Sequence, residues 1–154
     1  MQFLSFLFLL TFYPILRITF VPRAYRVRYD QYPKQRLKVG AALLYWLTVL
    51  IPLMMGEMPE IGGLGLHAVG AVLIVAAMRV NPFFVPDTVW LPGQYMVQQG
   101  VYRWLAHPGY TGMVLMTLGN VLALGTFAAI PSIFYLSLLF FHVRREREVL
   151  QHAR

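Results

Sequence analysis

The chain contains no cysteine and few charged residues. Its 154 residues include only 12% Asp, Glu, Lys and Arg, and 4 histidines. Without cysteine, disulfide bonds and thiolate metal sites are excluded. Soluble domains carry about 25% charged residues. The low charge, together with a hydrophobic content of 58%, therefore indicates an integral membrane protein.

The sequence also lacks the short motifs of several large enzyme classes. It has no G-x-G-x-x-G, no P-loop, no H-E-x-x-H and no G-x-S-x-G. These motifs mark dinucleotide, nucleoside triphosphate, zinc and serine-hydrolase sites. Any chemistry must therefore rest on a different arrangement of side chains.

Five apolar segments predict an all-α, polytopic membrane protein. They cover residues 1–20, 39–55, 64–80, about 108–125 and about 129–147. The last two come from one apolar stretch, 109–143, which as a single helix would be roughly 52 Å long and too long for a ~30 Å hydrocarbon core. Gly125-Thr126 and Pro131 divide that stretch, so we expect a tight helical hairpin. The first segment has no basic leader and no small-residue cleavage site, so we expect a retained helix.

The distribution of cations predicts an orientation. With five spans, all 13 Lys and Arg residues fall on one side of the membrane. The positive-inside rule makes that side cytoplasmic and puts the N-terminus outside. The net charge of +7 then indicates contact with anionic lipid headgroups, and no nucleic acid is expected as a partner. We expect a multi-pass protein of a bacterial or archaeal inner membrane.

The segment "YRWLAHPGYTG" (102–112) holds the most unusual polar residues. Proline is favoured at the first helical position, which puts His107 near the N-cap of the fourth span. A helix start offers free N–H groups that suit a carboxylate or phosphate. If the last two spans form a hairpin, Glu146 and Glu148 lie near His107. Such a pocket suits a zwitterionic or cationic ligand.

Glycine has simpler predicted roles elsewhere. We expect Gly112 and Gly119 to be helix-packing positions. The run "GGLG" (62–65) is interpreted as a turn that enters the third span.

The order of the motifs resembles the isoprenylcysteine carboxyl methyltransferase family of integral membrane enzymes. The chain reads "RVNPFF" (79–84), "GVYRWLAHPGYTG" (100–112), an apolar hairpin, and "RREREVL" (144–150). The family pattern is N-x-F-F, then G-P-Y-x-x-x-R-H-P-x-Y-x-G, a helical hairpin, and R-x-E-E-x-x-L. Val101, Ala106 and Arg147 stand where the family usually has proline, arginine and glutamate. The resemblance covers about residues 78–150.

The resemblance implies an S-adenosylmethionine-dependent methyltransferase with a lipophilic acceptor, such as a prenylcysteine-like carboxylate or a phenolic or pyrone lipid. It implies one membrane domain, 1–154, with residues 1–77 on the substrate side and 78–154 holding the cofactor. Arg145 and Glu146 are the catalytic candidates, and Asn81 and Arg103 the substrate-binding candidates. The cofactor-binding candidates are Gly100, Tyr102, His107, Pro108, Tyr110, Glu146 and Glu148.

Two other functions stay open from the sequence. Sterol-reductase-like membrane enzymes share a hairpin and an H-P-x-Y stretch and bind NADPH, although they usually have asparagine where Gly109 stands here. A non-catalytic membrane module of the same fold is the second alternative. Binding of S-adenosylmethionine or of NADPH separates these possibilities.

Overall fold

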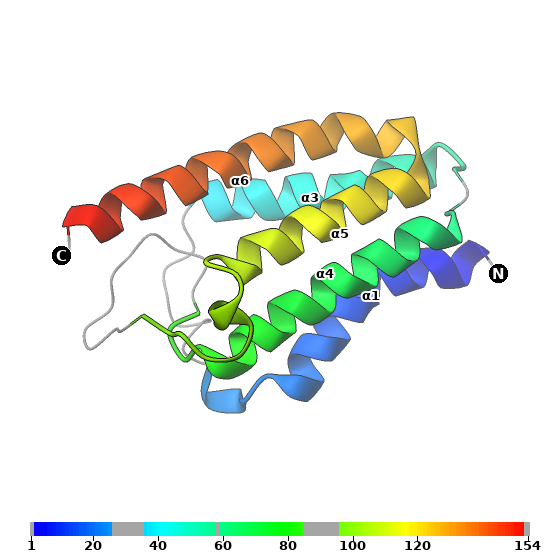
Figure 1. The fold of residues 1–154 in the computed structure, drawn as a ribbon. Coiled ribbons are helices and arrows are strands. Elements are labelled where there is room, and N and C mark those ends of the chain that lie inside the picture. Colours follow the sequence, from blue (N-terminus) through cyan, green and yellow to red (C-terminus); the bar gives the residue numbers. More distant parts are fainter. Residues whose placement is uncertain (1, 26–35, 58, 85–95, 153–154) are drawn as a thin grey trace.

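The computed structural model describes residues 2–25, 36–57, 59–84 and 96–152, and these form helices joined by turns (Figure 1). Five of the described helices have 17 residues or more. They are α1 (Gln2–Phe20), α3 (Arg36–Met54), α4 (Ile61–Val80), α5 (Pro108–Leu124) and α6 (Thr126–His152). A short 3-10 helix, η1 (Gly100–Arg103), precedes α5. The expected all-α class is confirmed for the described residues, and each predicted span corresponds to one of these helices.

Successive long helices run in opposite directions, so the two termini lie at opposite ends of the bundle (Figure 1). One end carries the end of α1, the start of α3, the end of α4, η1 and the end of α6. We call it the basic end, because Arg17, Arg36, Arg79, Arg103 and Arg144 come from these segments. The opposite end holds the turns α3–α4 and α5–α6, and we call it the turn end.

Glycine lets α4 and α5 pack backbone against backbone. A Cβ atom added at Gly70 would lie 2.5 Å from the Gly112 carbonyl oxygen, and one added at Gly119 would lie 2.5 Å from the His67 nitrogen. A Cβ at Gly63 would collide with the backbone of Ala123. Gly112 and Gly119 are therefore packing positions, as expected. The interpretation of the 62–65 run as only a turn was wrong for Gly63, which lies inside this interface.

The turn between α5 and α6 consists of one residue. Gly125 has φ +68° and ψ −153°, a conformation open essentially only to glycine. The hairpin is thus tighter than predicted. Pro131 takes no part in the turn and lies inside α6.

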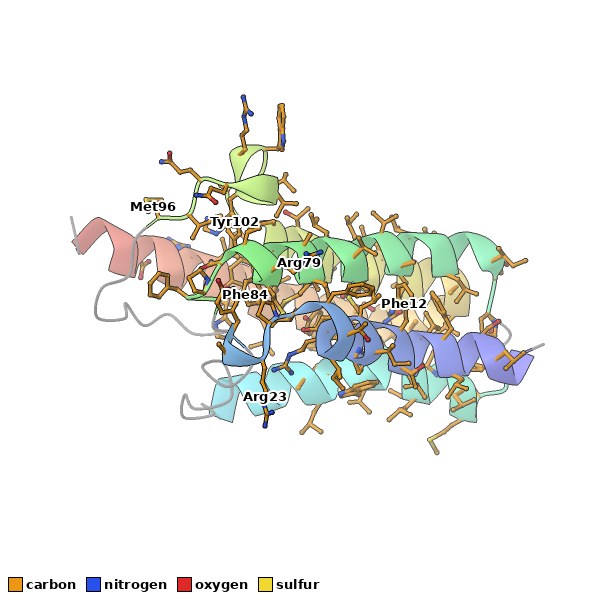
Figure 2. The ribbon with its side chains drawn as sticks, turned by 90° about the horizontal axis from the view of Figure 1, so that it is seen from below. Phe12, Arg23, Arg79, Phe84, Met96 and Tyr102 are labelled. Atoms are coloured by element: carbon orange, nitrogen blue, oxygen red, sulfur yellow. The ribbon has the colours of Figure 1, made fainter. Side chains whose placement is uncertain are left out.

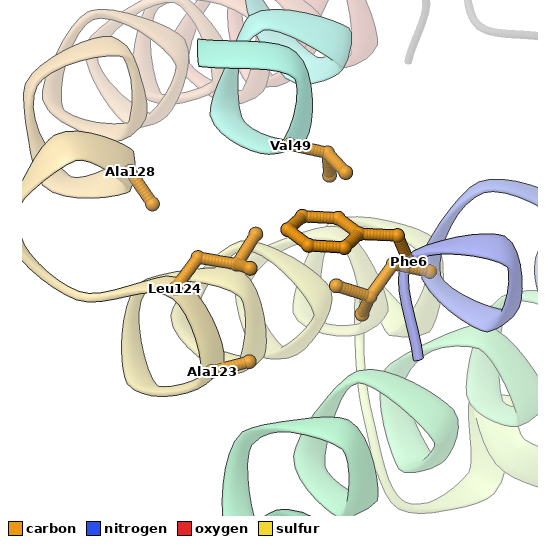
Figure 3. Close-up of a cluster of buried hydrophobic side chains, with 6 residues drawn as sticks. Phe6, Val49, Ala123, Leu124 and Ala128 are labelled. Atoms are coloured by element: carbon orange, nitrogen blue, oxygen red, sulfur yellow. The ribbon is translucent and has the colours of Figure 1, made fainter. Parts of the chain in front are cut away.

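Small and aromatic apolar side chains close the turn end of the bundle. Phe6 of α1 reaches across to Val49 of α3, and Leu9, Ala123, Leu124 and Ala128 complete the cluster (Figure 3). A second cluster, nearer the basic end, joins α1, α4 and α5. Because α1 and α3 both contribute to these clusters, the N-terminal helices pack as part of the same bundle.

Two of the described helices are long and apolar enough to cross a membrane by themselves. They are Ile61–Val80 and the Thr126–Arg144 part of α6. Leu4–Phe20 and Ala42–Met54 are apolar but shorter. At 1.5 Å per residue, the 20 residues of α4 extend about 30 Å, which matches the hydrocarbon core.

The α4–α5 contact predicts contrasting effects for two glycines on α4. Gly63→Ala should destabilise the protein by about 1–3 kcal/mol, because the methyl group meets backbone that cannot move aside. Gly65→Ala has open space around its Cβ and should be neutral or stabilising by up to about 1 kcal/mol. Thermal unfolding in detergent measures both, and equal midpoints for the two variants would contradict the interface.

Candidate functional site

The candidate site lies at the basic end, where the end of α4, the 96–107 segment and the start of α5 meet. Phe84 and Tyr102 lie by the end of α4 (Figure 2), where Asn81 contacts Tyr102. Phe84 also packs against the buried cluster that joins α1, α4 and α5. The site therefore rests on the apolar core of the bundle.

Asn81 connects two of the sequence motifs. Its Nδ2 donates a hydrogen bond of 3.0 Å to the Tyr102 hydroxyl. Its Oδ1 accepts one of 2.9 Å from the Phe83 backbone N–H. Asn81 also caps α4, with its own N–H bonded to the Ala77 carbonyl. One asparagine thus ends the helix, shapes the turn after it and holds Tyr102.

The backbone conformation of η1 allows Tyr102 to reach Asn81. Gly100 has φ +57°, in the left-handed region that favours glycine. A Cβ on Gly100 would lie 3.2 Å from Val80 Cγ1, so the segment passes close to the end of α4. The positive φ at Gly100 thus accounts for the glycine that opens the second motif.

Phe84 fixes the start of α5. A Cβ added at Gly109 would lie 2.8 Å from two ring atoms of Phe84. The Phe84 ring therefore lies directly over the first turn of the helix, a contact that any larger residue at position 109 would displace. Phe84 was not among the predicted site residues, although the N-x-F-F motif contains it.

The start of α5 has the geometry expected from the sequence. His107 is the N-cap residue and makes no side-chain capping bond, and Pro108 occupies the first helical position. Thr111 bonds back to the His107 carbonyl through its N–H at 3.0 Å and its hydroxyl at 3.1 Å. The rings of His107 and Tyr110 lie side by side, with centroids 5.9 Å apart. First-turn N–H groups at such an end have no partner in the helix, so they suit an anionic group.

The remaining candidates lie on exposed surface or outside the described side chains. The Arg103 guanidinium lies 5.4 Å from the centroid of the Trp104 ring, which is 80% exposed. Glu148 pairs with Arg144 at 3.9 Å along α6. Exposed pairs of this kind contribute little stability. Arg145 and Glu146 belong to α6, but their side chains lie outside the described residues.

The structure thus brings together Asn81, Gly100, Tyr102, His107, Pro108 and Tyr110, all within the end of α4, the η1 segment and the start of α5. Glu148 lies on α6, the second helix of the hairpin. The roles of these residues in binding remain predictions.

The model of the isoprenylcysteine carboxyl methyltransferase (ICMT) family matches residues 64–152. The chain belongs to this family. The matched range runs from α4 through α6 and includes every candidate site residue. Family membership supports a membrane-bound methyltransferase. No curated protein and no solved structure matches the chain.

The hydrogen bond between Asn81 and Tyr102 can be tested by a double-mutant cycle. Asn81→Ala and Tyr102→Phe should each destabilise the protein. Their combined effect should be smaller than the sum by about 0.5–1.5 kcal/mol, because both remove the same bond. Thermal unfolding of the ICMT-family protein in detergent gives the four values.

Thr117→Ala provides the control for this cycle. The Thr117 hydroxyl bonds within α5 to the Met113 carbonyl, about 12 Å along the helix from Gly109. The destabilisation caused by Thr117→Ala should therefore add fully to that caused by Asn81→Ala. Full additivity of Asn81→Ala with Tyr102→Phe as well would show that the two side chains do not interact.

Proposed function

We propose that the protein transfers the methyl group of S-adenosylmethionine to a lipophilic acceptor at the cytoplasmic face of the membrane. The observation that carries the proposal is the family match over residues 64–152. The acceptor class is a prenylcysteine-like carboxylate or a phenolic or pyrone lipid. The geometry at the start of α5 supports the same assignment.

The residues at the basic end fit the functional groups of the cofactor. The carboxylate of S-adenosylmethionine matches the first turn of α5 after Pro108, since a helix start favours negative charge. Tyr102 and Tyr110 offer flat aromatic surfaces beside that helix start. Glu146 and Glu148, on the helix that returns from the hairpin, are proposed to meet the ammonium group or the ribose hydroxyls.

When bound, the cofactor supplies an electrophilic methyl group on a sulfonium. The protein's task is then to align the acceptor and exclude water, and acid–base machinery is secondary. Arg103 and Arg145 are proposed to hold an anionic acceptor or to stabilise a phenolate. Asn81 was assigned to the substrate from the sequence, and its bond to Tyr102 supports a role in shaping the pocket wall.

We further propose five membrane spans, with the basic end in the cytoplasm of a bacterial or archaeal cell and the N-terminus outside. The antiparallel order of the five helices (Figure 1) and the gathering of cations at one end support this topology. The basic residues would then contact anionic headgroups. α1 and α3 would form the side through which the acceptor enters from lipid.

The proposal predicts methyl transfer from labelled S-adenosylmethionine into the lipid extract of membranes that contain the protein. His107→Ala and Glu146→Gln should each lower cofactor affinity about tenfold or more, because each removes a charge-assisted or polar contact of about 1.4 kcal/mol or more. Titration of the detergent-solubilised protein with S-adenosylmethionine measures this affinity.

Glu60→Gln is the matched control, since Glu60 is an exposed carboxylate at the turn end. The affinity of this variant for S-adenosylmethionine should equal that of the unmodified protein. Binding of NADPH without S-adenosylmethionine would favour the reductase-like alternative. Binding of neither nucleotide, with no label in lipid, would favour a non-catalytic module.

A further inference from the structure

The turn that follows α4 contacts both parts of the candidate site. Asn81 is its first residue and Phe84 its last. The Asn81 side chain donates a hydrogen bond to Tyr102 of η1. The Phe84 ring lies over Gly109, in the first turn of α5. One short turn therefore joins the two segments that carry most of the cofactor candidates.

Three hydrogen bonds hold this turn in its conformation. The Asn81 N–H bonds to the Ala77 carbonyl at 3.1 Å. The Phe83 N–H bonds to Asn81 Oδ1 at 2.9 Å, and the Phe84 N–H bonds to the Asn81 carbonyl at 3.2 Å. The backbone at Phe84 is therefore fixed relative to the end of α4.

The Phe84 ring contacts both the buried core and the start of α5. It packs against the cluster that includes Ile74 and Met78 of α4 and Met116 of α5. Its Cε2 and Cζ atoms would each lie 2.8 Å from a Cβ added at Gly109. Because protein interiors are close-packed, a ring that packs against the core has little room to move aside. The ring thus sets how closely the start of α5 approaches the end of α4.

Glycine at position 109 is explained by this contact and not by its backbone. Gly109 is not among the glycines with positive φ, so other residues could adopt its conformation. His107 and Pro108 precede it and Tyr110 follows it, and the rings of His107 and Tyr110 have centroids 5.9 Å apart. A shift of Gly109 would therefore move three cofactor candidates together.

We propose that Phe84 is a positioning residue for cofactor binding, because its ring sets where the first turn of α5 lies relative to Tyr102. Asn81 holds the η1 part and Phe84 the α5 part, so the 81–84 turn keeps a fixed spacing between them. A ligand that contacts several groups at once binds more tightly when those groups are already in place. The inference rests on the proposed binding of S-adenosylmethionine, and names a residue that acts on it indirectly.

A pair of size changes tests the role of Phe84. Gly109→Ala places a methyl group against the ring, and Phe84→Leu removes the ring atoms that the methyl group would meet. Each single substitution should raise the Kd for S-adenosylmethionine about tenfold, which corresponds to about 1.4 kcal/mol. In the double variant the methyl group occupies the space that the ring leaves. Its Kd should return to within about threefold of the unmodified value, whereas independent losses would multiply to about 100-fold.

Phe6→Leu and Gly63→Ala are the matched controls. Phe6 is a buried ring at the turn end, and a Cβ at Gly63 meets backbone there. Both variants should lower the thermal midpoint and leave the Kd for S-adenosylmethionine unchanged, measured well below their midpoints. This comparison separates the positioning of the first turn of α5 from a general loss of stability.

An unchanged Kd in Gly109→Ala, or a double variant in which the losses multiply, would overturn the role of Phe84. The first of these results does not require Phe84→Leu to fold. An unmodified protein that binds no S-adenosylmethionine would contradict the proposed function as well, so the two failures are distinguished by the unmodified protein alone.

Discussion

The backbone contact between α4 and α5 is the constraint on which the rest of the structure depends. Gly63 and Gly70 of one helix meet Gly112 and Gly119 of the other, with no side chain between them. Small residues of this kind let helices approach closely where lipid removes the hydrophobic drive for association. The contact fixes how far each helix extends along the other. That register brings His67 to Asn120 in the interior and Phe84 to Gly109 at the basic end.

From this register, two polar connections follow at different depths. At the basic end, Asn81 joins the end of α4 to Tyr102 and so holds the segment that leads to His107. Inside the bundle, Asn120 joins α4 to α3. Both are asparagines that bridge elements far apart in the sequence. The first shapes the candidate cofactor pocket. The second defines how the helices are arranged inside the bundle, which a uniformly apolar core would not specify.

Much of the helical layout could be predicted from the sequence, since apolar length and charge placement determine where membrane helices lie. The ranges 64–80 and 108–125 correspond closely to α4 and α5. The turn at Gly125 was placed too broadly, because Pro131 is tolerated within α6 and does not end it. Gly63 was missed, because its role depends on the register with Ala123, which no local pattern encodes.

The candidate site was also only partly predictable, because local sequence patterns encode a helix start but not the contacts between distant segments. Pro108 and His107 signal a helix start locally, so their geometry followed from sequence. The contacts of Asn81 with Tyr102, and of Phe84 with Gly109, join residues 21 and 25 positions apart and depend on how α4, η1 and α5 are arranged in space. The roles of Arg145 and Glu146 rest on the family pattern, because their side chains lie outside the described residues.

Hydrogen exchange with and without S-adenosylmethionine tests the central claim, that the junction of α4, η1 and α5 holds the cofactor. Bound cofactor should slow exchange in residues 100–111 and leave exchange in the 55–57 turn and the α5–α6 turn at the opposite end unchanged. Bound cofactor that protects the turn end instead, or protects neither end, would contradict the placement of the site.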